Sequence, residues 1–448
     1  MSEAVGHEGV ADWLVGLRGS LGEAQVADVP EALAAHALDD HTPRAVVTPQ
    51  SVEQLAEVLR LAGANRLAVT PWGGGTKQGL GRPLTRLDLV LKTGGLARIL
   101  ELDEGNLTAE VEAGMSLGAL QAELAQRRLF FALDPLEGEQ ATLGGIIATN
   151  ASGPKRLYYR TARDHVLGMR VALPDGRLLR TGGKTVKDVA GYNLTKPLIG
   201  SWGTAGVVVS ATIRLQPAPE DSATVVAAFP AVAPAAALAL KVRGTFLLPT
   251  AMELVSQGAW QVAGGGSLAG NGATLAFLLE GAREAVARHE RDLTALAQGA
   301  GAVMVATLRG DDMAAAWRQR QRVAGALQAA FAGLARAKVG VPLSALGTIL
   351  AVAESEGAKR GLGLAFAAHA GNGLAQVYFV GGEDVMRDAL LSLRQAATNL
   401  GGYLLLETAS LSLKQKVGVL PARDDYDIMR QLKASLNPGD SLNPGKLV

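Results

Sequence analysis

The chain has 448 residues, 48% of them hydrophobic and 19% charged, with a formal net charge of +1. This length predicts two or three domains, each with its own core, and the near-balanced charge excludes a field that would draw the protein to nucleic acid or anionic lipid. The lack of cysteine excludes disulfides, thiolate metal sites, a cysteine nucleophile and an iron–sulfur cluster held by this chain's thiolates.

Neither a signal peptide nor a membrane span is expected. Residues 1–15 are acidic and lack the basic-then-apolar layout of a signal peptide. The longest apolar runs, such as residues 229–240, contain prolines and stay short of spanning length. The sequence therefore predicts a cytoplasmic protein without direct membrane insertion.

Helix and strand patterns alternate in the first half of the chain. Residues 1–41 are expected to form a helical extension. Ser51 is expected to cap a helix over residues 52–64, because it precedes apolar residues at helical spacing, with Glu53 and Gln54 in the first turn. Three short strands and a second helix are expected next, at 66–70, 87–93, 106–114 and 116–127.

The rest of the chain predicts a hairpin, a boundary and a second mixed region. The hairpin covers residues 168–179, with a Pro-Asp-Gly turn. A strand over residues 207–217 ends the first region, and the prolines that follow mark a boundary. Beyond it we expect alanine-rich helices over residues 282–298 and 313–337. A hairpin with an Asn-Gly turn is expected over residues 362–380. The fold class expected is α+β with two main domains.

The glycine-rich stretch 67–81, LAVTPWGGGTKQGLG, is compatible with either a surface turn or a nest of backbone N–H groups for a phosphate. A Rossmann loop would lead directly into a helix, but a proline and a strand pattern follow here. Gly183-Lys184-Thr185 resembles the end of a triphosphate loop, yet Leu178 stands where that motif requires glycine. A nest between strands remains.

Three later segments have the same small, hydroxyl-bearing and amide-bearing character, at 134–153, 187–194 and 200–206. Such residues suit an extended, multi-ring ligand that carries a pyrophosphate. Four segments of this kind in less than a third of the chain are hard to explain as independent turns.

In this order, PWGGGT, DP, ATLGGIIATNASG, KDVAGYNL and IGSWGTAGVV resemble the FAD-binding domain of the vanillyl-alcohol oxidase / p-cresol methylhydroxylase (PCMH) superfamily. The C-terminal part, with its closing LNPGKL, resembles the 2-hydroxyacid branch, in particular the FAD-binding (E) subunits of glycolate oxidases. The resemblance implies a helical extension (1–41) followed by a PCMH-type FAD-binding domain of two α+β subdomains (42–218). It further implies an α+β cap domain (219–405) and a C-terminal segment that returns to the FAD domain (406–448).

The resemblance implies non-covalent FAD, because there is no cysteine and no histidine matches a flavinylation position. For Lys187 and Tyr192, expected near the isoalloxazine, a solvated lysine and a core tyrosine are the alternatives. Trp202 and Ala205 depart from the family, which often has Glu and Leu there. The residues implied to contact FAD are Pro71, Trp72, Gly73, Gly74, Gly75, Thr76, Lys77, Asp134, Pro135, Thr142, Gly144, Gly145, Asn150, Ser152, Gly153, Lys187, Tyr192, Gly203, Gly206 and Val207.

The catalytic positions of the family are only partly retained. Hydroxyacid oxidation needs a cation for the substrate carboxylate and a base or metal for the hydroxyl proton. Relatives supply the metal and base from His-x-Gly-Asp-Gly-Asn-x-His and Glu-His-Gly; here His369 and Glu407 remain, but Gln376 and Thr408 replace histidines. Arg320 matches a Trp-x-x-Arg arginine that grips the carboxylate, with a solvated helix face as the alternative. A hydrogen-bonded histidine at a strand end is the favoured reading of His369, and no metal site is expected.

The resemblance thus implies an FAD-binding subunit of a glycolate oxidase/dehydrogenase complex. The partners implied are a catalytic flavin subunit, an iron–sulfur subunit and a small 2-hydroxy acid, with electrons from glycolate oxidation to glyoxylate passing through FAD. Contact with the inner membrane would be peripheral, through those partners. The alternatives are a self-sufficient FAD-linked 2-hydroxyacid (D-lactate/glycolate) dehydrogenase and a fold that has lost its flavin.

Overall fold

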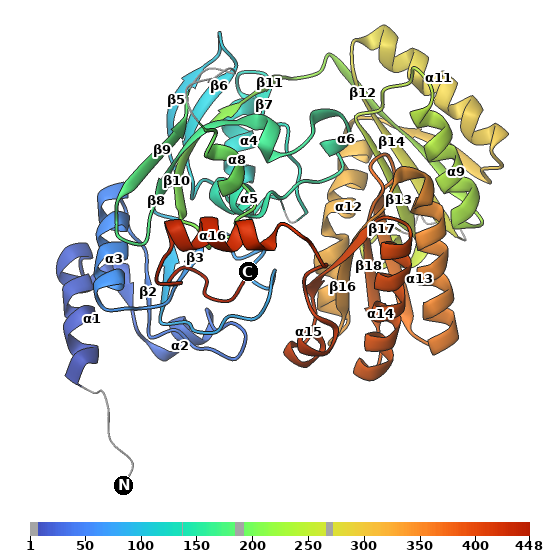
Figure 1. Cartoon of the computed structure of the whole chain (residues 1–448). Helices are drawn as coiled ribbons and strands as arrows, with labels where there is room; N and C mark the ends of the chain where they lie inside the picture. The colour runs from blue at the N-terminus through green and yellow to red at the C-terminus, as the bar shows by residue number, and fades with distance from the viewer. Residues whose placement is uncertain (1–7, 137, 184–191, 266–271) are drawn as a thin grey trace.

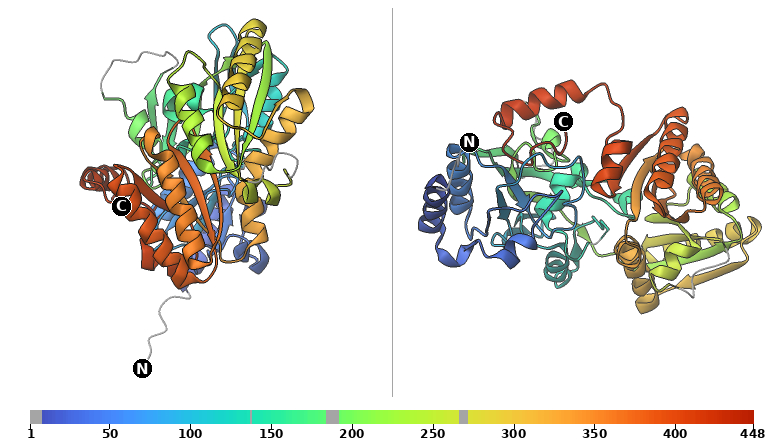
Figure 2. Two further views of the ribbon diagram at one scale, coloured as in Figure 1. Left: turned by 90° about the vertical axis from the view of Figure 1, so that its right-hand side faces the viewer. Right: turned by 90° about the horizontal axis from the view of Figure 1, so that it is seen from below.

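The computed structural model describes residues 8–136, 138–183, 192–265 and 272–448. Figure 1 shows two lobes side by side, the first built from the N-terminal half and the second from the C-terminal half. The C-terminal segment, drawn in red, returns from the second lobe to the first (Figure 1 and Figure 2). Within the described ranges, no helix is both long enough and apolar enough to cross a membrane.

A small sheet with parallel central strands lies in the first lobe. Helix α3 (Val52–Ala64) begins where the Ser51 side chain accepts a hydrogen bond from the backbone N–H of Gln54, and its apolar face is buried, as the sequence predicts. The sheet has the order β1-β2-β4-β3, with β2, β4 and β3 parallel. The elements of this part are α1 (Glu8–Leu21), η1 (Glu23–Gln25), β1 (Val26–Ala27), α2 (Pro30–Ala34), β2 (Ala45–Val47), β3 (Val69–Trp72) and β4 (Leu89–Lys92).

A five-stranded antiparallel sheet, in the order β5-β6-β10-β8-β9, completes the first lobe. The predicted 168–179 hairpin is its β8–β9 pair, and helices α4 and α5 pack on it through a shared apolar core. Its elements are β5 (Ile99–Asp103), β6 (Thr108–Glu112), α4 (Leu117–Ala125), β7 (Leu129–Phe130), α5 (Leu143–Thr149), α6 (Arg156–Tyr159), α7 (Ala162–His165), β8 (Val166–Ala172), β9 (Leu178–Gly182), α8 (Thr195–Leu198), β10 (Val207–Arg214) and β11 (Gln216–Pro217).

The second lobe is an antiparallel sheet of eight strands in the order β15-β12-β14-β13-β17-β18-β16-β19. One face packs on α9, α11, α13 and α14, and the other packs on α10 and α12. Its elements are β12 (Asp221–Phe229), α9 (Val232–Arg243), β13 (Ala251–Ser256), α10 (Gln257–Val262), β14 (Ala273–Gly281), α11 (Arg283–Gly299), β15 (Met304–Leu308), α12 (Gly310–Ala330), β16 (Ala335–Gly340), η3 (Leu343–Ala345), α13 (Leu346–Arg360), β17 (Gly363–His369), β18 (Leu374–Val380), α14 (Glu383–Asn399) and β19 (Tyr403–Thr408).

The helix expected over residues 313–337 is too long. Helix α12 ends at Ala330, Gly333 adopts a positive φ of 76°, and β16 pairs with β18 and β19. Alanine-rich composition favours helix locally, but sheet pairing with two distant strands decides the conformation of residues 335–340. This correction affects the site, because β16 carries Arg336.

The C-terminal segment contains α15 (Leu411–Val417) and α16 (Tyr426–Leu436) and then lies along β3. The backbone N–H of Val69 donates to Ser441 O at 2.7 Å, and that of Asn443 donates to Val69 O at 3.0 Å. Leu442 is buried in the core below the small sheet. The tail thus contributes to the wall of the first lobe next to the glycine loop.

Candidate functional site

A cleft lies in the first lobe where the loop after β3, the start of α5, the segment before β10 and the C-terminal tail meet. Thirteen of the residues predicted to contact FAD line it: Pro71, Trp72, Gly73, Gly74, Gly75, Thr76, Lys77, Thr142, Gly144, Gly145, Gly203, Gly206 and Val207. Four sequence-distant segments therefore converge on one cleft.

The glycine loop is held by close packing against a second predicted segment. A Cβ on Gly74 would overlap the carbonyl oxygen of Gln140, and one on Gly73 would overlap Oγ1 of Thr142. Thr142 in turn caps α5, since its hydroxyl accepts from the Gly145 N–H at 3.3 Å. Glycine is thus required at 73 and 74 so that the loop can lie on residues 140–142, and this contact shapes the cleft wall.

The sequence reasoning missed two side chains of the C-terminal tail, Asn443 and Lys446, which line the cleft. Nδ2 of Asn443 donates to Trp202 O at 2.8 Å, whereas its buried Oδ1 accepts no hydrogen bond within the described part of the chain. The available signal was the closing LNPGKL motif, which the resemblance included without assigning its residues. The other missed lining residues are Gln78, Leu80, Thr93, Ala148, Thr149, Trp202 and Val208.

A second group of predicted residues gathers around Asp134 instead of lining the cleft. Both carboxylate oxygens of Asp134 accept from the Lys155 backbone N–H at 3.1 Å, and burial raises the pKa of this carboxyl to about 7. A Cβ on Gly153 would overlap the Asp134 carbonyl, and the Ser152 hydroxyl accepts from Arg156. In the described structure these residues shape the turn that precedes α6.

The remaining residues predicted to contact FAD do not line the cleft in the described structure. Pro135 follows Asp134, and Asn150 ends α5 in the left-handed conformation, with a φ of 48°. Lys187 lies outside the described residues. The Tyr192 side chain is 97% exposed, so it is not the core tyrosine offered as an alternative.

The catalytic candidates Arg320 and His369 share one buried carboxylate, Glu253 on β13, which the sequence reasoning missed. Oε2 of Glu253 accepts from Nε of Arg320 at 2.6 Å, and Oε1 lies 2.5 Å from Nδ1 of His369. Arg320 is 1% exposed, so the solvated-face interpretation is wrong. Burial lowers the pKa of His369 although Glu253 opposes this, so we expect a neutral, hydrogen-bonded imidazole at the end of β17. The signal for Glu253 was a lone charge within an apolar strand.

Glu407, the third catalytic candidate, lies among cations. Its Oε2 is 3.4 Å from Nε of Arg336. Burial would raise the pKa of Glu407, but Arg336, Lys338 and Lys77 outweigh this effect and hold it below its ordinary value. The carboxylate is therefore ionised and neutralised by side chains from both lobes.

Strand β16 places cationic side chains opposite Gln376 and Thr408, the two residues that replace histidines of the family. In register, Gln376 lies opposite Lys338, and Thr408 lies opposite Arg336. Cationic neighbours disfavour a bound metal ion, and among the described residues no three His, Asp or Glu side chains come together as metal ligands do. The described residues around His369 and Glu407 do not offer a divalent-metal ligand set.

A second cavity lies between the lobes and shares the wall 74–78 with the cleft. The second lobe contributes Gln328, Arg336 and Thr408 to its lining, and the first lobe contributes Lys77. The cleft thus borders a space with positive charge on both sides. Such a space suits a small carboxylate.

Comparison with known proteins identifies the family. Residues 43–182 match the FAD binding domain, and residues 218–447 match the C-terminal domain of FAD linked oxidases. The chain belongs to the FAD-linked oxidases. FAD as cofactor and the oxidoreductase class are thereby confirmed.

Two relatives of this FAD-linked oxidase match nearly end to end. It is 30% identical over 423 residues to the glycolate oxidase subunit GlcD of Bacillus subtilis (strain 168), covering 90% of this chain and 89% of the relative. It is also 30% identical over 422 residues to a D-lactate dehydrogenase of Archaeoglobus fulgidus, covering 90% and 91%.

Solved structures confirm the PCMH-type α+β fold of the FAD-linked oxidase. p-Cresol methylhydroxylase with substrate bound superposes with a TM-score of 0.79 at 16% identity, over 99% of this chain and 97% of that one. An alkyldihydroxyacetonephosphate synthase gives a TM-score of 0.76 at 17% identity, over 97% and 86%.

The cleft of this oxidase fits FAD. Four segments line it, its glycine loop contributes to the wall, and Oδ1 of Asn443, which has no partner among the described residues, can accept from a polar ligand. When bound, the flavin accepts two electrons from a substrate C–H bond. The chain itself contributes the binding walls and the charges that face the neighbouring cavity.

Proposed function

We propose that this chain is the FAD-binding subunit of a glycolate oxidase/dehydrogenase complex. In this proposal it takes part in the oxidation of a small 2-hydroxy acid by a catalytic flavin subunit, and the electrons pass through its non-covalent FAD to an iron–sulfur subunit. The substrate class and the complex follow the names of its relatives, a glycolate oxidase subunit and D-lactate dehydrogenases.

One observation carries the proposal: the cleft that fits FAD is retained, while Gln376 and Thr408 stand in place of two expected catalytic histidines. Glu253 engages both Arg320 and His369, and Arg336 pairs with Glu407. Neither an amide nor a threonine hydroxyl serves as a general base, whereas His369 keeps its second ring nitrogen and Nη1 of Arg320 has no hydrogen-bond partner within the described part of the chain. The loss of the two histidines therefore supports flavin binding and electron transfer best.

The alternative, a self-sufficient 2-hydroxyacid dehydrogenase, rests on the interlobe cavity. Lys77 and Arg336 give it positive charge beside the flavin cleft, where a substrate carboxylate could be held. The D-lactate dehydrogenase relative, matched over 91% of its length, favours the same alternative.

Co-expression distinguishes the two. We expect the tagged chain to co-purify with a catalytic flavin subunit and an iron–sulfur subunit, and glycolate-dependent dye reduction to require all three. Omission of this chain should abolish the activity of the complex. Recovery of the tagged chain alone, with full dye reduction by glycolate, would support the self-sufficient dehydrogenase.

A further inference from the structure

A buried junction of charges lies beside the FAD cleft, where four distant segments meet. Lys446 of the tail is 3% exposed; its ammonium donates to the Gln78 carbonyl and lies 3.5 Å from Oδ2 of Asp39. Lys414 of α15 donates to the Gly79 carbonyl at 2.7 Å and lies 4.0 Å from Oδ1 of the same aspartate. One carboxylate thus serves two ammonium groups.

The junction carries more positive than negative charge. Oδ2 of Asp39 also accepts from the Leu84 N–H at 3.0 Å, which disperses its negative charge further. Burial lowers the pKa of both lysines, that of Lys446 to about 8; Asp39 opposes this shift for both, and Lys414 adds to it for Lys446. A buried cation without a full counter-charge is costly unless an anion approaches it.

The FAD cleft supplies a place for that anion. Lys446 lines the cleft beside Gln78, which directly follows the loop predicted to wrap the pyrophosphate. Three residues earlier in the tail, the buried Oδ1 of Asn443 faces the same cleft without a partner among the described residues. The ammonium group of Lys446 and Oδ1 of Asn443 can therefore each bind a polar group of a ligand in the cleft.

We propose that Lys446 binds the diphosphate of FAD and that the Asp39–Lys414–Lys446 junction makes docking of the C-terminal segment depend on the bound cofactor. The inference rests on FAD binding by this family and not on the substrate or partners proposed above. The diphosphate supplies the negative charge that the junction lacks. Because Asp39 contacts both lysines, binding of the diphosphate at Lys446 strengthens the contact between Asp39 and Lys414 of α15.

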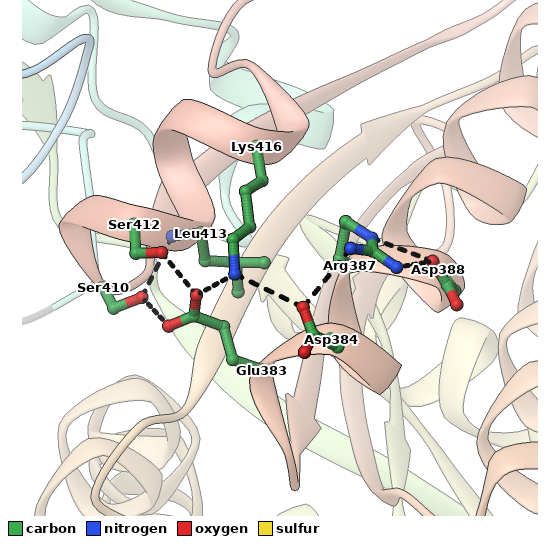
Figure 3. Close-up of polar contacts among 8 residues, drawn as sticks. All are labelled: Glu383, Asp384, Arg387, Asp388, Ser410, Ser412, Leu413 and Lys416. Atoms are coloured by element: carbon green, nitrogen blue, oxygen red, sulfur yellow. Dashed lines mark hydrogen bonds and ion pairs between the residues drawn. The ribbon is translucent and has the colours of Figure 1, made fainter.

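Helix α15 is fixed to the second lobe, so the junction connects the FAD cleft of the first lobe to the second lobe. Ser410 and Ser412 at the start of α15 donate to the Glu383 carboxylate at 2.8 and 2.6 Å, and Lys416 lies 3.0 Å from the same group at the start of α14 (Figure 3). The serine hydrogen bonds, then Lys416, hold the pKa of Glu383 at about 2, so this anchor persists across the physiological range. Lys414 on the same helix reaches the first lobe.

The test compares Lys446→Met with Lys433→Met in the full chain. Lys433 is a matched control: it is 9% exposed and holds the tail through Val448 O and Asp440, but it does not belong to the described cleft lining. Apoprotein titrated with FAD and with ADP should bind both ligands about 10- to 100-fold more weakly in Lys446→Met, the range for loss of a charged hydrogen bond. Wild-type affinity in Lys446→Met, or an equal loss in Lys433→Met, would overturn the assignment.

The pH dependence separates a phosphate contact from a packing role. The ligand favours protonated Lys446, so wild-type FAD affinity should be constant below about pH 8 and fall above it. Lys446→Arg stays charged at higher pH and should bind FAD with little of this decline, which also covers the case that Lys446→Met fails to fold. A wild-type pH profile in Lys446→Arg would refute the contact.

Hydrogen exchange tests the coupling to α15. FAD should slow amide exchange in residues 411–417 of the wild type, and Lys414→Met should lose this protection while it still binds FAD. Equal protection in the variant would refute the coupling. If the wild type itself bound no FAD, the cofactor assignment would fail rather than this inference.

Discussion

Glu253 decides the state of two side chains that the sequence marks as catalytic candidates. Its carboxylate is fully buried and pairs with Arg320 through one oxygen and with His369 through the other. Removing one partner of a buried ion pair leaves an uncompensated charge, which costs far more than the loss of an exposed pair. The residue is therefore a positioning group for the interior of the second lobe.

Glu253→Gln should lower the free energy of unfolding by about 3–5 kcal/mol, because Arg320 would remain buried without its carboxylate. Urea denaturation of the FAD-loaded protein measures this change. Asp388→Asn is the control: it breaks an exposed pair with Arg387 at 2.9 Å and should cost less than about 1 kcal/mol. Similar losses in the two variants would contradict the buried ion pair.

Asp134 gives a prediction for pH. Its folded-state pKa of about 7 lies above the ordinary value of 3.8, so between these values the folded state holds a proton that the unfolded state has released. This contribution to stability is present at low pH and is lost as the pH rises through about 7. Asp134→Asn should reduce the fall in apoprotein stability between pH 4 and 7, measured by urea unfolding. An unchanged slope would contradict the raised pKa.

At the scale of elements, local signals in the sequence predict what local interactions determine. Ser51 and the apolar spacing after it predict helix α3 with its bounds, and the Asn-Gly turn predicts the β17–β18 hairpin. The glycine loop, the start of α5 and the segment before β10 line one cleft, whereas the predicted residues around Asp134 do not. Composition fails where distant pairing decides: residues 335–337 look helical, yet they form β16 between two strands.

The same limit explains the missing parts of the site. Arg336 comes next to Glu407 only because β16 pairs with β19, and Lys446 reaches the cleft only because the tail lies along β3. Neither contact leaves a periodic pattern in the sequence. Glu253, likewise, becomes meaningful only when α12 and β17 bring Arg320 and His369 to its two oxygens.

Strand β16 makes a specific prediction for the interlobe cavity. Arg336→Gln should weaken binding of oxalate, a small carboxylate probe, by about tenfold or more, because a charge-assisted contact is lost. The change in the flavin spectrum during titration of the FAD-loaded protein measures this affinity. Arg322→Gln, an exposed arginine of α12, is the control and should bind as the wild type does. Equal affinities in both variants would contradict an anion site at Arg336.

At the scale of the whole molecule, the two lobes contribute different parts of one site. The first lobe and the returning tail form the cleft that fits FAD, and the second lobe contributes Arg336 and Thr408 to the cavity beside it. Gln376 and Thr408, which stand at the positions of the family's histidines, lie opposite Lys338 and Arg336 in the sheet. The chain retains a cleft that fits FAD while Gln376 and Thr408 replace two expected histidines, which agrees with the proposed partner that performs the oxidation.

The most direct test of this account is anaerobic spectroscopy of the purified, FAD-loaded chain. Glycolate or D-lactate alone should leave the visible absorbance of the flavin unchanged, whereas dithionite should bleach it and so prove the flavin reducible. Glycolate should bleach it after the catalytic flavin subunit and the iron–sulfur subunit are added. Complete bleaching of the isolated chain by either acid would contradict the account and identify a self-sufficient dehydrogenase.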